Sequence, residues 1–250
     1  MINDKTRKKI EVMREAGKIL GEVLFEVMNA IKPGVTEIEL DKLAERLILE
    51  KGAEPGFKKV DGYEHSICVS TNDVVVHGIP KDRELKNGDI IGVDCGVYLN
   101  GYHTDMAETK IVGETSNPEV VRFVEAGKKA MFAGIRQAKV GRRVGHISQA
   151  MQEVMEGSGY SVVKSLVGHG VGKELHEEPE IPGYGEIGTG PALKSDMTLA
   201  IEVIYTKGKY DLVLEKDNWT YSTADKSWGG LFEMTVIVGK QKAEVLTFWK

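Results

Sequence analysis

Cysteine is scarce in this sequence. Its 250 residues include two, Cys68 and Cys95, too few for a disulfide framework, and we expect both to be reduced thiols. The chain also lacks an apolar run of about 18 residues, the length that a membrane-spanning helix needs. Its first residues carry charge where a signal peptide would have its apolar stretch. These absences predict a cytoplasmic protein with no membrane segment.

An excess of positive charge is missing too. The formal net charge is −5 and the isoelectric point is near 5.8, which argues against a general nucleic-acid binder because such proteins rely on many phosphate contacts. What is present is a globular composition, 41% hydrophobic and 28% charged, in a chain long enough to bury a sizeable core. We therefore expect one compact domain covering residues 1–250.

The first half opens with the pattern of two helices. Apolar residues recur at steps of three and four from about residue 7 to 31, and Pro33-Gly34 ends this amphipathic stretch. Thr36 and Glu39 then form a capping-box pattern at the start of a second helix, which we expect to stop near Gly52.

The same plan returns in the second half. Asn117 followed by Pro118 predicts another helix start, and a further helix is expected from about Val144 to Met155. We interpret the two halves, roughly 7–112 and 117–238, as an internal repeat. Helices grouped before strands favour an α+β fold over a doubly wound one. The expected strands lie at 66–76, 90–97, 102–112, 161–167, 198–205 and 230–238.

Two aspartates flank a predicted hairpin. Asn100-Gly101 is a strong turn signal, and centring a two-residue turn there pairs Asp105 with Gly96. Strand alternation then places Asp94 on the same face, diagonally across from Asp105. Converging carboxylates repel each other and usually hold a cation or a shared proton. Taken alone, the pair is equally compatible with two ordinary strand-end aspartates.

Further imidazole and carboxylate side chains follow. His169 and His176 stand seven residues apart in one glycine-rich segment, a spacing too irregular for two histidines on one helix face, and the glycines would let backbone and ligands approach closely. Glu202 and Glu233 each interrupt apolar, strand-like sequence, where an unpaired buried carboxylate is costly. Metal coordination would offset that cost, although either glutamate alone fits a strand-end carboxylate facing water better.

Together these motifs resemble the type I, bacterial-type methionine aminopeptidases over essentially the whole chain. The matching segments are SICVSTNDVVVHGIP, VDCGVYLNGYHTDMAET, GHGVGKELHEEP, AIEVIY and GLFEMTVIV, in the family's order. The resemblance implies the pita-bread fold, a pseudo-two-fold α+β domain with an antiparallel sheet and two helix pairs packed on one face. It also implies metal-assisted hydrolysis that removes the initiator methionine from nascent proteins and favours a small second residue.

The same resemblance implies a paired metal site in which Asp105 and Glu233 bridge both ions. Four carboxylates and one imidazole form a mostly hard donor set, which suits two divalent ions of Mn, Fe or Co, tolerates Zn and fits Mg less well. The sequence does not choose among these metals. The implied ligands are Asp94, Asp105, His169, Glu202 and Glu233.

Catalytic roles follow from the resemblance as well. Glu202 would shuttle the proton of the attacking water. His77 and His176 would contact the substrate amide and stabilise the tetrahedral intermediate, as oxyanion donors do. A lone histidine such as His77, at the end of an apolar strand, is otherwise more often a structural residue.

The resemblance also implies an apolar pocket for the methionine thioether. Its lining would include Tyr63, Cys68 and Trp219. Leu175 stands where many relatives have an aromatic residue. From the sequence alone each of these residues fits the core equally well, and His65 and His103 are expected at the surface or behind the ligands.

Two positions depart from the family's pattern: Val203 stands where a proline is usual, and Met234 where a histidine is common. Neither residue is a ligand, but the sequence does not predict how the two changes affect the backbone next to Glu202 and Glu233. One rival interpretation is an Xaa-Pro aminopeptidase or dipeptidase of the same fold, but such enzymes normally carry an arginine-bearing motif where this chain has Met106 to Thr109. The other is a metal-free pita-bread binding module, which usually loses ligands, whereas all five are present.

The expected partners are the N-terminal peptides of nascent proteins. A transient contact with the ribosome is compatible with this role, but nothing in the acidic sequence identifies a ribosome-binding surface, a specificity for nucleic acid or an attachment to membranes. The resemblance favours a monomer.

Overall fold

Four helices appear close to where the sequence predicts them. The computed structural model describes residues 4–248, and its α-helices are α1 (Asp4–Ala30), α2 (Glu37–Glu50), α3 (Pro118–Ile135) and α4 (Val144–Gly157), with a short 3₁₀ helix η1 (Phe57–Lys59). The capping box of Thr36 and Glu39 is present at the start of α2, and the side chain of Asn117 caps α3. The predicted helix starts are therefore confirmed.

The strands form one large antiparallel sheet and one small one. The large sheet runs in the order β1-β4-β5-β12-β9-β7-β8, while β2 pairs with β4, β6 with β9 and β13 with β12. Its strands are β1 (Glu54–Pro55), β2 (Ile67–Thr71), β4 (Ile90–Leu99), β5 (Tyr102–Ile111), β6 (Ser161–Val162), β7 (Gly168–Gly170), β8 (Glu177–Ile181), β9 (Thr198–Thr206), β12 (Gly229–Ile237) and β13 (Glu244–Val245). The small sheet contains β3 (Val74–Val76), β10 (Leu212–Leu214) and β11 (Tyr221–Thr223), in the order β10-β11-β3.

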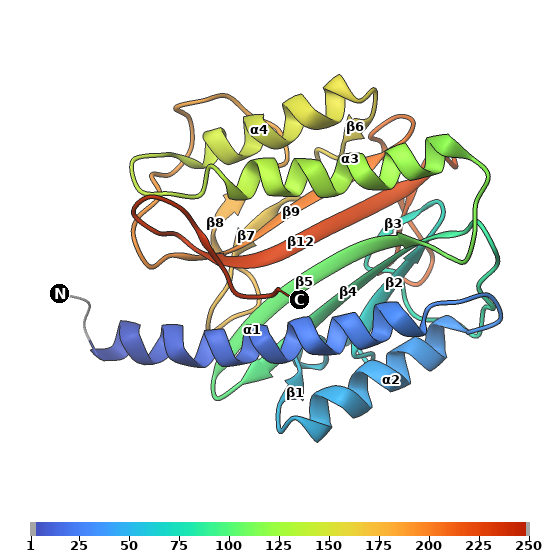
Figure 1. Cartoon of the computed structure of the whole chain (residues 1–250), viewed down its shortest axis with the longest axis horizontal. Coiled ribbons are helices and arrows are strands. Elements are labelled where there is room, and N and C mark those ends of the chain that lie inside the picture. Colours follow the sequence, from blue (N-terminus) through green and yellow to red (C-terminus); the bar gives the residue numbers. More distant parts are fainter. Residues whose placement is uncertain (1–3, 249–250) are drawn as a thin grey trace.

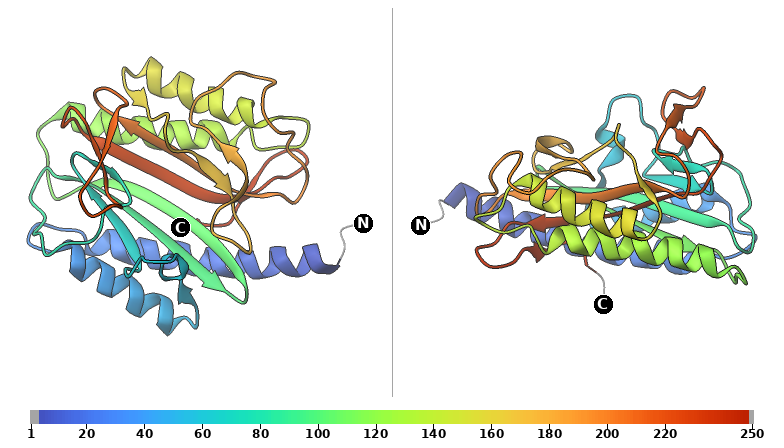
Figure 2. Two further views of the ribbon diagram at one scale, coloured as in Figure 1. Left: turned by 180° about the vertical axis from the view of Figure 1, so that it is seen from behind. Right: turned by 90° about the horizontal axis from the view of Figure 1, so that it is seen from above.

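The helices cover one face of the large sheet. In Figure 1, α1 crosses in front of β4 and β5, and α3 lies along β9 and β12, so each helix pair covers one half of the sheet. The other face carries the loops and the small sheet (Figure 2). This is the pita-bread α+β architecture that the sequence predicts. The boundaries of the internal repeat, 7–112 and 117–238, remain a prediction.

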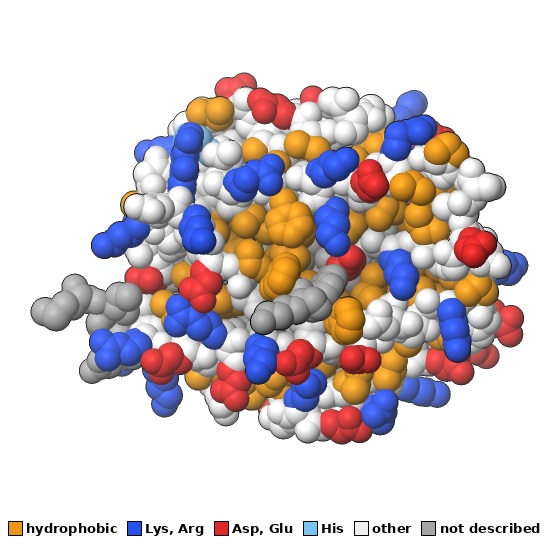
Figure 3. All heavy atoms as spheres, viewed as in Figure 1, with side chains coloured by type: hydrophobic (Ala, Val, Ile, Leu, Met, Phe, Trp, Pro, Cys, Tyr) orange, Lys and Arg blue, Asp and Glu red, His pale blue; other side chains and the backbone are white. Residues whose placement is uncertain are grey.

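On the helical face, apolar side chains gather along a groove between α1 and α3, bordered by lysines and arginines (Figure 3). Phe25 and Met28 of α1, Val124 of α3 and Phe232 of β12 line this groove. Among the described residues, no helix is both long and apolar enough to cross a membrane.

Three strand predictions need correction. The segment 66–76 is two strands rather than one, because Asn72 takes a left-handed conformation (φ 59°) and turns the chain between β2 and β3. The segment 161–167 forms a strand only at its first two residues, in β6. The glycine-rich segment, for which no strand was predicted, contains β7, which carries His169, and leads into β8.

Candidate metal centre

Two rows of residues cross the large sheet side by side. The first row consists of backbone partners on β2, β4, β5, β12 and β9: Cys68, Asp94, Ala107, Glu233 and Glu202. The second row lies two residues away on the shared strands and consists of Gly96, Asp105, Thr235, Ala200 and His169. Residues two apart in a strand point to the same face. The five expected ligands therefore lie on one face of the sheet, and the predicted pairing of Asp105 with Gly96 is confirmed.

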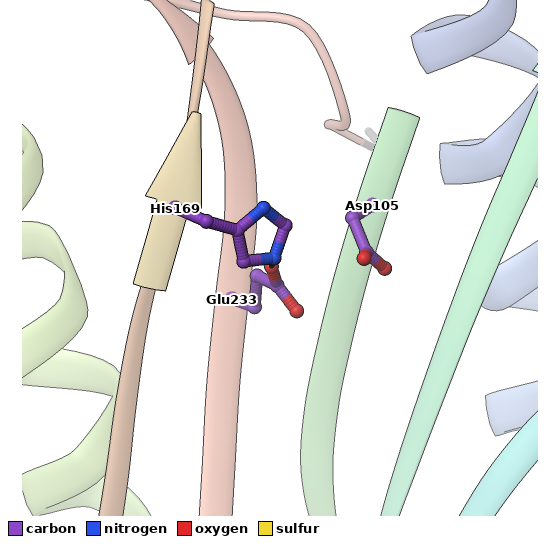
Figure 4. A group of neighbouring side chains, drawn as sticks. All are labelled: Asp105, His169 and Glu233. Carbon is purple, nitrogen blue, oxygen red and sulfur yellow. Dashed lines mark ion pairs between the residues drawn. The ribbon is translucent and has the colours of Figure 1, made fainter. Parts of the chain in front are cut away.

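Three of these side chains converge closely. Figure 4 shows Asp105 on β5, His169 on β7 and Glu233 on β12 pointing toward a common point. One ligand atom from each lies within 4.8 Å of the others, and Nε2 of His169 is 3.8 Å from Oε1 of Glu233. All three residues are buried. Asp94 and Glu202 line the same pocket, which opens to solvent.

The carboxylates oppose one another electrostatically. Burial raises the pKa of Asp105 to about 7, and burial with the nearby charge of Asp105 raises the pKa of Glu202 to about 8. Burial and the charges of Asp105 and Glu202 also raise the pKa values of Asp94 and Glu233 well above their ordinary range. The site therefore disfavours four simultaneous negative charges and favours a proton or a cation among the carboxylates.

The donor set fits a divalent cation. Oδ1 of Asp94 and Oε1 of Glu233 are buried and have no hydrogen-bond partner among the described residues, which is costly unless something else binds them. Nδ1 of His169 lies 2.9 Å from the carbonyl oxygen of Gly170. A proton on Nδ1 would satisfy that contact and leave the lone pair of Nε2 facing the carboxylates, the arrangement that metal-ligating histidines use.

Glycine permits the close packing around His169. A Cβ on Gly168 would lie 2.8 Å from the carbonyl oxygen of Ala200 and 3.2 Å from Cγ of Glu202. Any larger residue at this position would therefore displace β9 or the Glu202 side chain. The close approach predicted for this segment is confirmed.

Two further histidines stand at the pocket. His77 follows β3 in a left-handed conformation (φ 54°), and its ring contacts that of Tyr221 at 6.0 Å between centroids. His176 is exposed at the mouth, and its ring centroid lies 4.4 Å from that of His169. Burial, with the nearby His176, lowers the pKa of His77 to about 4, and desolvation lowers the pKa of His176. Both rings are therefore neutral near pH 7, and each has one N–H to donate.

An apolar compartment adjoins the acidic rows. Tyr63, Cys68 and Leu175 are buried in one cluster with Phe57, and Trp219 packs against it. The rings of Tyr63 and Trp219 meet edge to face at 5.1 Å, and the Tyr63 hydroxyl donates to the carbonyl of Ile67 at 2.8 Å. The structure thus brings the expected pocket residues together beside the carboxylates.

Some residues that line the pocket were not predicted from the sequence. Leu231 lies two residues before Glu233 on the same face of β12, so strand alternation was a signal for it. Phe57 and Val60 come from η1 and the residue that caps its C-terminal end, where the sequence carries no corresponding signal.

The two histidines expected at the surface or behind the ligands, His65 and His103, differ in their burial. His65 is half-buried, with Nδ1 3.1 Å from Oδ2 of Asp41. His103 is buried, so a surface position is wrong for it: the side chain is 5% exposed, the ring lies 4.7 Å from that of Tyr98, and Nδ1 has no hydrogen-bond partner among residues 4–248.

The two departures from the family's pattern face away from the site. Val203 and Met234 each lie next to a ligand in sequence, so alternation turns their side chains to the opposite face of the sheet. Both are buried in the main hydrophobic core with residues of α1 and α3. They therefore shape the packing under the helices rather than the lining of the pocket.

Comparisons with known proteins also indicate a metallopeptidase, in agreement with the buried cluster of histidine and carboxylates on the sheet. Residues 11–240 match the profile of metallopeptidase family M24. The chain belongs to this family of metallopeptidases. Within it, the chain belongs to the methionine aminopeptidases, as the following relatives establish.

The methionine aminopeptidases match this chain over essentially their entire length. Proteins called methionine aminopeptidase from Clostridium perfringens and Clostridium acetobutylicum are 43% and 46% identical to this chain, with coverage of 100% and 99% of both chains. The crystal structure of methionine aminopeptidase from Thermotoga maritima superposes with a TM-score of 0.95 at 40% identity and covers 100% of both chains. The prolidase from Pyrococcus furiosus shares the fold, with a TM-score of 0.78 at 24% identity, but this chain spans only 64% of it.

Proposed function

We propose that this chain removes the N-terminal methionine from proteins by metal-dependent hydrolysis. The observation that carries the proposal is the juxtaposition of an acidic, His-containing cluster with an apolar compartment in a chain of the methionine aminopeptidase family. The cluster fits the chemistry of peptide hydrolysis, and the compartment fits an unbranched apolar side chain.

The proposed ligands are the five acidic and imidazole residues of the two rows. Asp105 and Glu233, on adjacent strands, would bridge two divalent ions, while Asp94, His169 and Glu202 complete the set. When bound, such ions supply Lewis-acid chemistry that polarises a peptide carbonyl and acidifies water at neutral pH. The donor set suits Mn, Fe or Co and tolerates Zn.

The protein's own groups then move the proton and orient the substrate. Glu202, at the edge of the cluster, would accept the proton of the attacking water and deliver it to the leaving amine. His77 and His176, neutral near pH 7, would donate their N–H groups to the scissile amide and to the developing oxyanion.

The substrate side chain would lie in the apolar compartment. Tyr63, Cys68 and Trp219 would contact the methionine, with Leu175 on the same cluster. A small second residue, a cytoplasmic location, a transient contact with the ribosome and a monomeric state complete the proposal, and they rest on the family resemblance.

A metal add-back assay tests the function. The protein is stripped with a chelator and assayed on Met-Ala-Ser and Ala-Pro-Ala after separate addition of Mn, Co, Fe or Zn. Release of methionine that depends on metal, with no cleavage before proline, is expected and would rank the metals. Preference for the proline peptide would assign the chain to the Xaa-Pro enzymes, and metal binding without any cleavage would favour a binding module.

A further inference from the structure

The seam between β5 and β12 separates the two carboxylates proposed to bridge the ions. Asp105 lies on β5 and Glu233 on β12, so the distance between these strands sets the distance between the carboxylates. In the part of the chain that the structure describes, only two residue pairs along this seam have regular strand pairing, Glu233 with Ala107 and Met234 with Met106. By contrast, β4 and β5 are paired along ten residues each. The spacing at the bridging residues therefore depends on contacts other than a long ladder.

Thr235 provides such a contact at Asp105. Its hydroxyl donates to the carbonyl oxygen of Asp105 at 2.8 Å and accepts from the backbone N–H of Asp105 at 2.9 Å. One side-chain oxygen thus satisfies both backbone groups that a neighbouring strand would normally pair.

The backbone of Thr235 is engaged elsewhere. Its N–H donates to the hydroxyl of Thr247 at 3.0 Å, and its carbonyl accepts from the N–H of Leu246 at 2.9 Å. The segment that follows β13 therefore occupies the edge of β12 that would otherwise pair with β5. Without the hydroxyl of Thr235, the backbone groups of Asp105 on this side would lose both partners, and they are buried.

Thr109 makes the equivalent contact on the other side of Glu233. Its hydroxyl donates to the carbonyl of Leu231 at 2.6 Å and accepts from the N–H of Leu231 at 3.0 Å. Thr109 follows Asp105 by four residues, as Thr235 follows Leu231, so the two hydroxyl contacts are related by the pseudo-two-fold symmetry of the sheet. Both threonines are buried, with exposures of 2% and 0%.

The two contacts differ in what they hold. Thr109 fixes Leu231, which is not among the proposed ligands. Thr235 fixes Asp105 and also lies beside Ala200, whose other backbone partner is His169. The Thr235 hydroxyl therefore stands in the row between two of the three converging side chains.

We propose that Thr235 is a positioning residue for the metal centre, whose hydroxyl fixes Asp105 relative to Glu233 and His169. The proposal rests on the proposed function, because it assumes that these residues bind metal. It predicts that the hydroxyl matters for metal affinity, whereas the symmetric hydroxyl of Thr109 matters for stability only.

Metal affinity in matched variants tests this role. Chelator-stripped wild type, Thr235→Val, Thr235→Ser and Thr109→Val are titrated with Co²⁺ and followed by visible absorption and calorimetry. Thr235→Val keeps the shape but loses the hydroxyl, and its Kd for Co²⁺ is expected to rise about 10- to 100-fold. Thr235→Ser keeps the hydroxyl and should bind near the wild-type affinity. Thr109→Val should lower Tm as Thr235→Val does, with its Co²⁺ affinity unchanged.

The possible outcomes separate the two proposals. Wild-type Co²⁺ affinity in Thr235→Val, or an equal loss in Thr109→Val, overturns the positioning role and leaves the proposed function intact. Failure of the wild type to bind Co²⁺ overturns both. If Thr235→Val does not fold, then Thr235→Ser and Thr235→Ala differ in the same hydroxyl, and weaker binding by the alanine variant alone supports the role, while equal affinities refute it.

Discussion

Glu202 and Glu233 lie directly opposite each other on the adjacent strands β9 and β12, with both side chains on the same buried face of the sheet. Like charges in this position destabilise a sheet. Burial raises the pKa values of both groups, and the neighbouring charge of Asp105 raises them further. The repulsion between these carboxylates therefore destabilises the metal-free protein, and a bound cation would relieve it.

Replacing Glu233 by Gln should separate stability from function. The amide keeps the shape of the side chain but cannot ionise, so the metal-free protein no longer has to hold this carboxylate beside its acidic neighbours, and its free energy of unfolding at pH 8 should rise by roughly 1 to 3 kcal/mol. Metal binding and peptide hydrolysis should be lost. Urea unfolding and Co²⁺ titration measure the two effects, and Glu180→Gln, on an exposed position of β8, is the control. A destabilised metal-free Glu233→Gln would contradict the electrostatic argument.

Stability of the metal-free protein should fall as pH rises. The pKa of Asp105 is raised from 3.8 to about 7 and that of Glu202 from 4.5 to about 8, so the folded state binds more protons than the unfolded state between pH 4 and 8. The stabilisation is complete below the ordinary pKa values and is lost as pH passes the raised ones. Urea unfolding in chelator should give a free energy on the order of 6 kcal/mol lower at pH 8 than at pH 5, the sum of the two shifts over this range.

A divalent cation should reverse this trend. Binding holds the carboxylates in their charged form, so stability in excess Mn²⁺ should increase between pH 5 and pH 8 as the ligands lose their protons. If the stripped protein is equally stable at both pH values, the carboxylates are not buried together as the structure has them.

The sequence predicted the first half of the site better than the second. Asn100-Gly101 fixes the register of β4 and β5, and that register alone places Asp94 and Asp105 on one face. His169 had no such signal, because β7 has three residues and is specified by pairing with β9, far away in sequence. A strand of that length carries no alternation pattern.

Strands β10 and β11 of the small sheet were missed for a similar reason, and β3 was predicted only as the end of a longer strand. The strands of this sheet have three residues each, and β10 exposes Val213 and Leu214, which a sequence interpretation would not distinguish from a surface loop. Its role is nevertheless central, since β3 leads into His77 and the turn between β10 and β11 carries Trp219. Short strands that depend on tertiary packing are the elements that local patterns specify least.

Removing the His77 side chain should reduce turnover without weakening metal binding. His77→Ala loses the proposed donor, and kcat should fall by about 10²-fold or more. Alanine also tolerates the left-handed backbone of this position poorly, so His77→Asn is the better test: asparagine accepts this conformation and keeps a polar group. Both variants should bind Co²⁺ as the wild type does. Turnover near the wild-type value in His77→Ala would exclude the residue from the mechanism.

Trp219 should determine how tightly the methionine side chain binds. The Asp217 carboxylate accepts from the N–H groups of Trp219 and Thr220 at 3.0 and 2.8 Å, and this turn directs the indole onto Tyr63 at the apolar compartment. Truncation in Trp219→Ala removes apolar surface that the substrate would bury, so KM for Met-Ala-Ser should rise roughly 10-fold while kcat changes less.

The exposed Val213 offers a matched control for Trp219 on the same hairpin, because Val213→Ala changes an apolar side chain that lies outside the pocket. Its KM should stay at the wild-type value. A parallel rise of KM in both variants would mean that the hairpin as a whole, rather than the indole, sets the affinity. An unchanged KM in Trp219→Ala would instead leave Tyr63, Cys68 and Leu175 as the methionine pocket, since these three belong to the buried cluster against which the tryptophan packs.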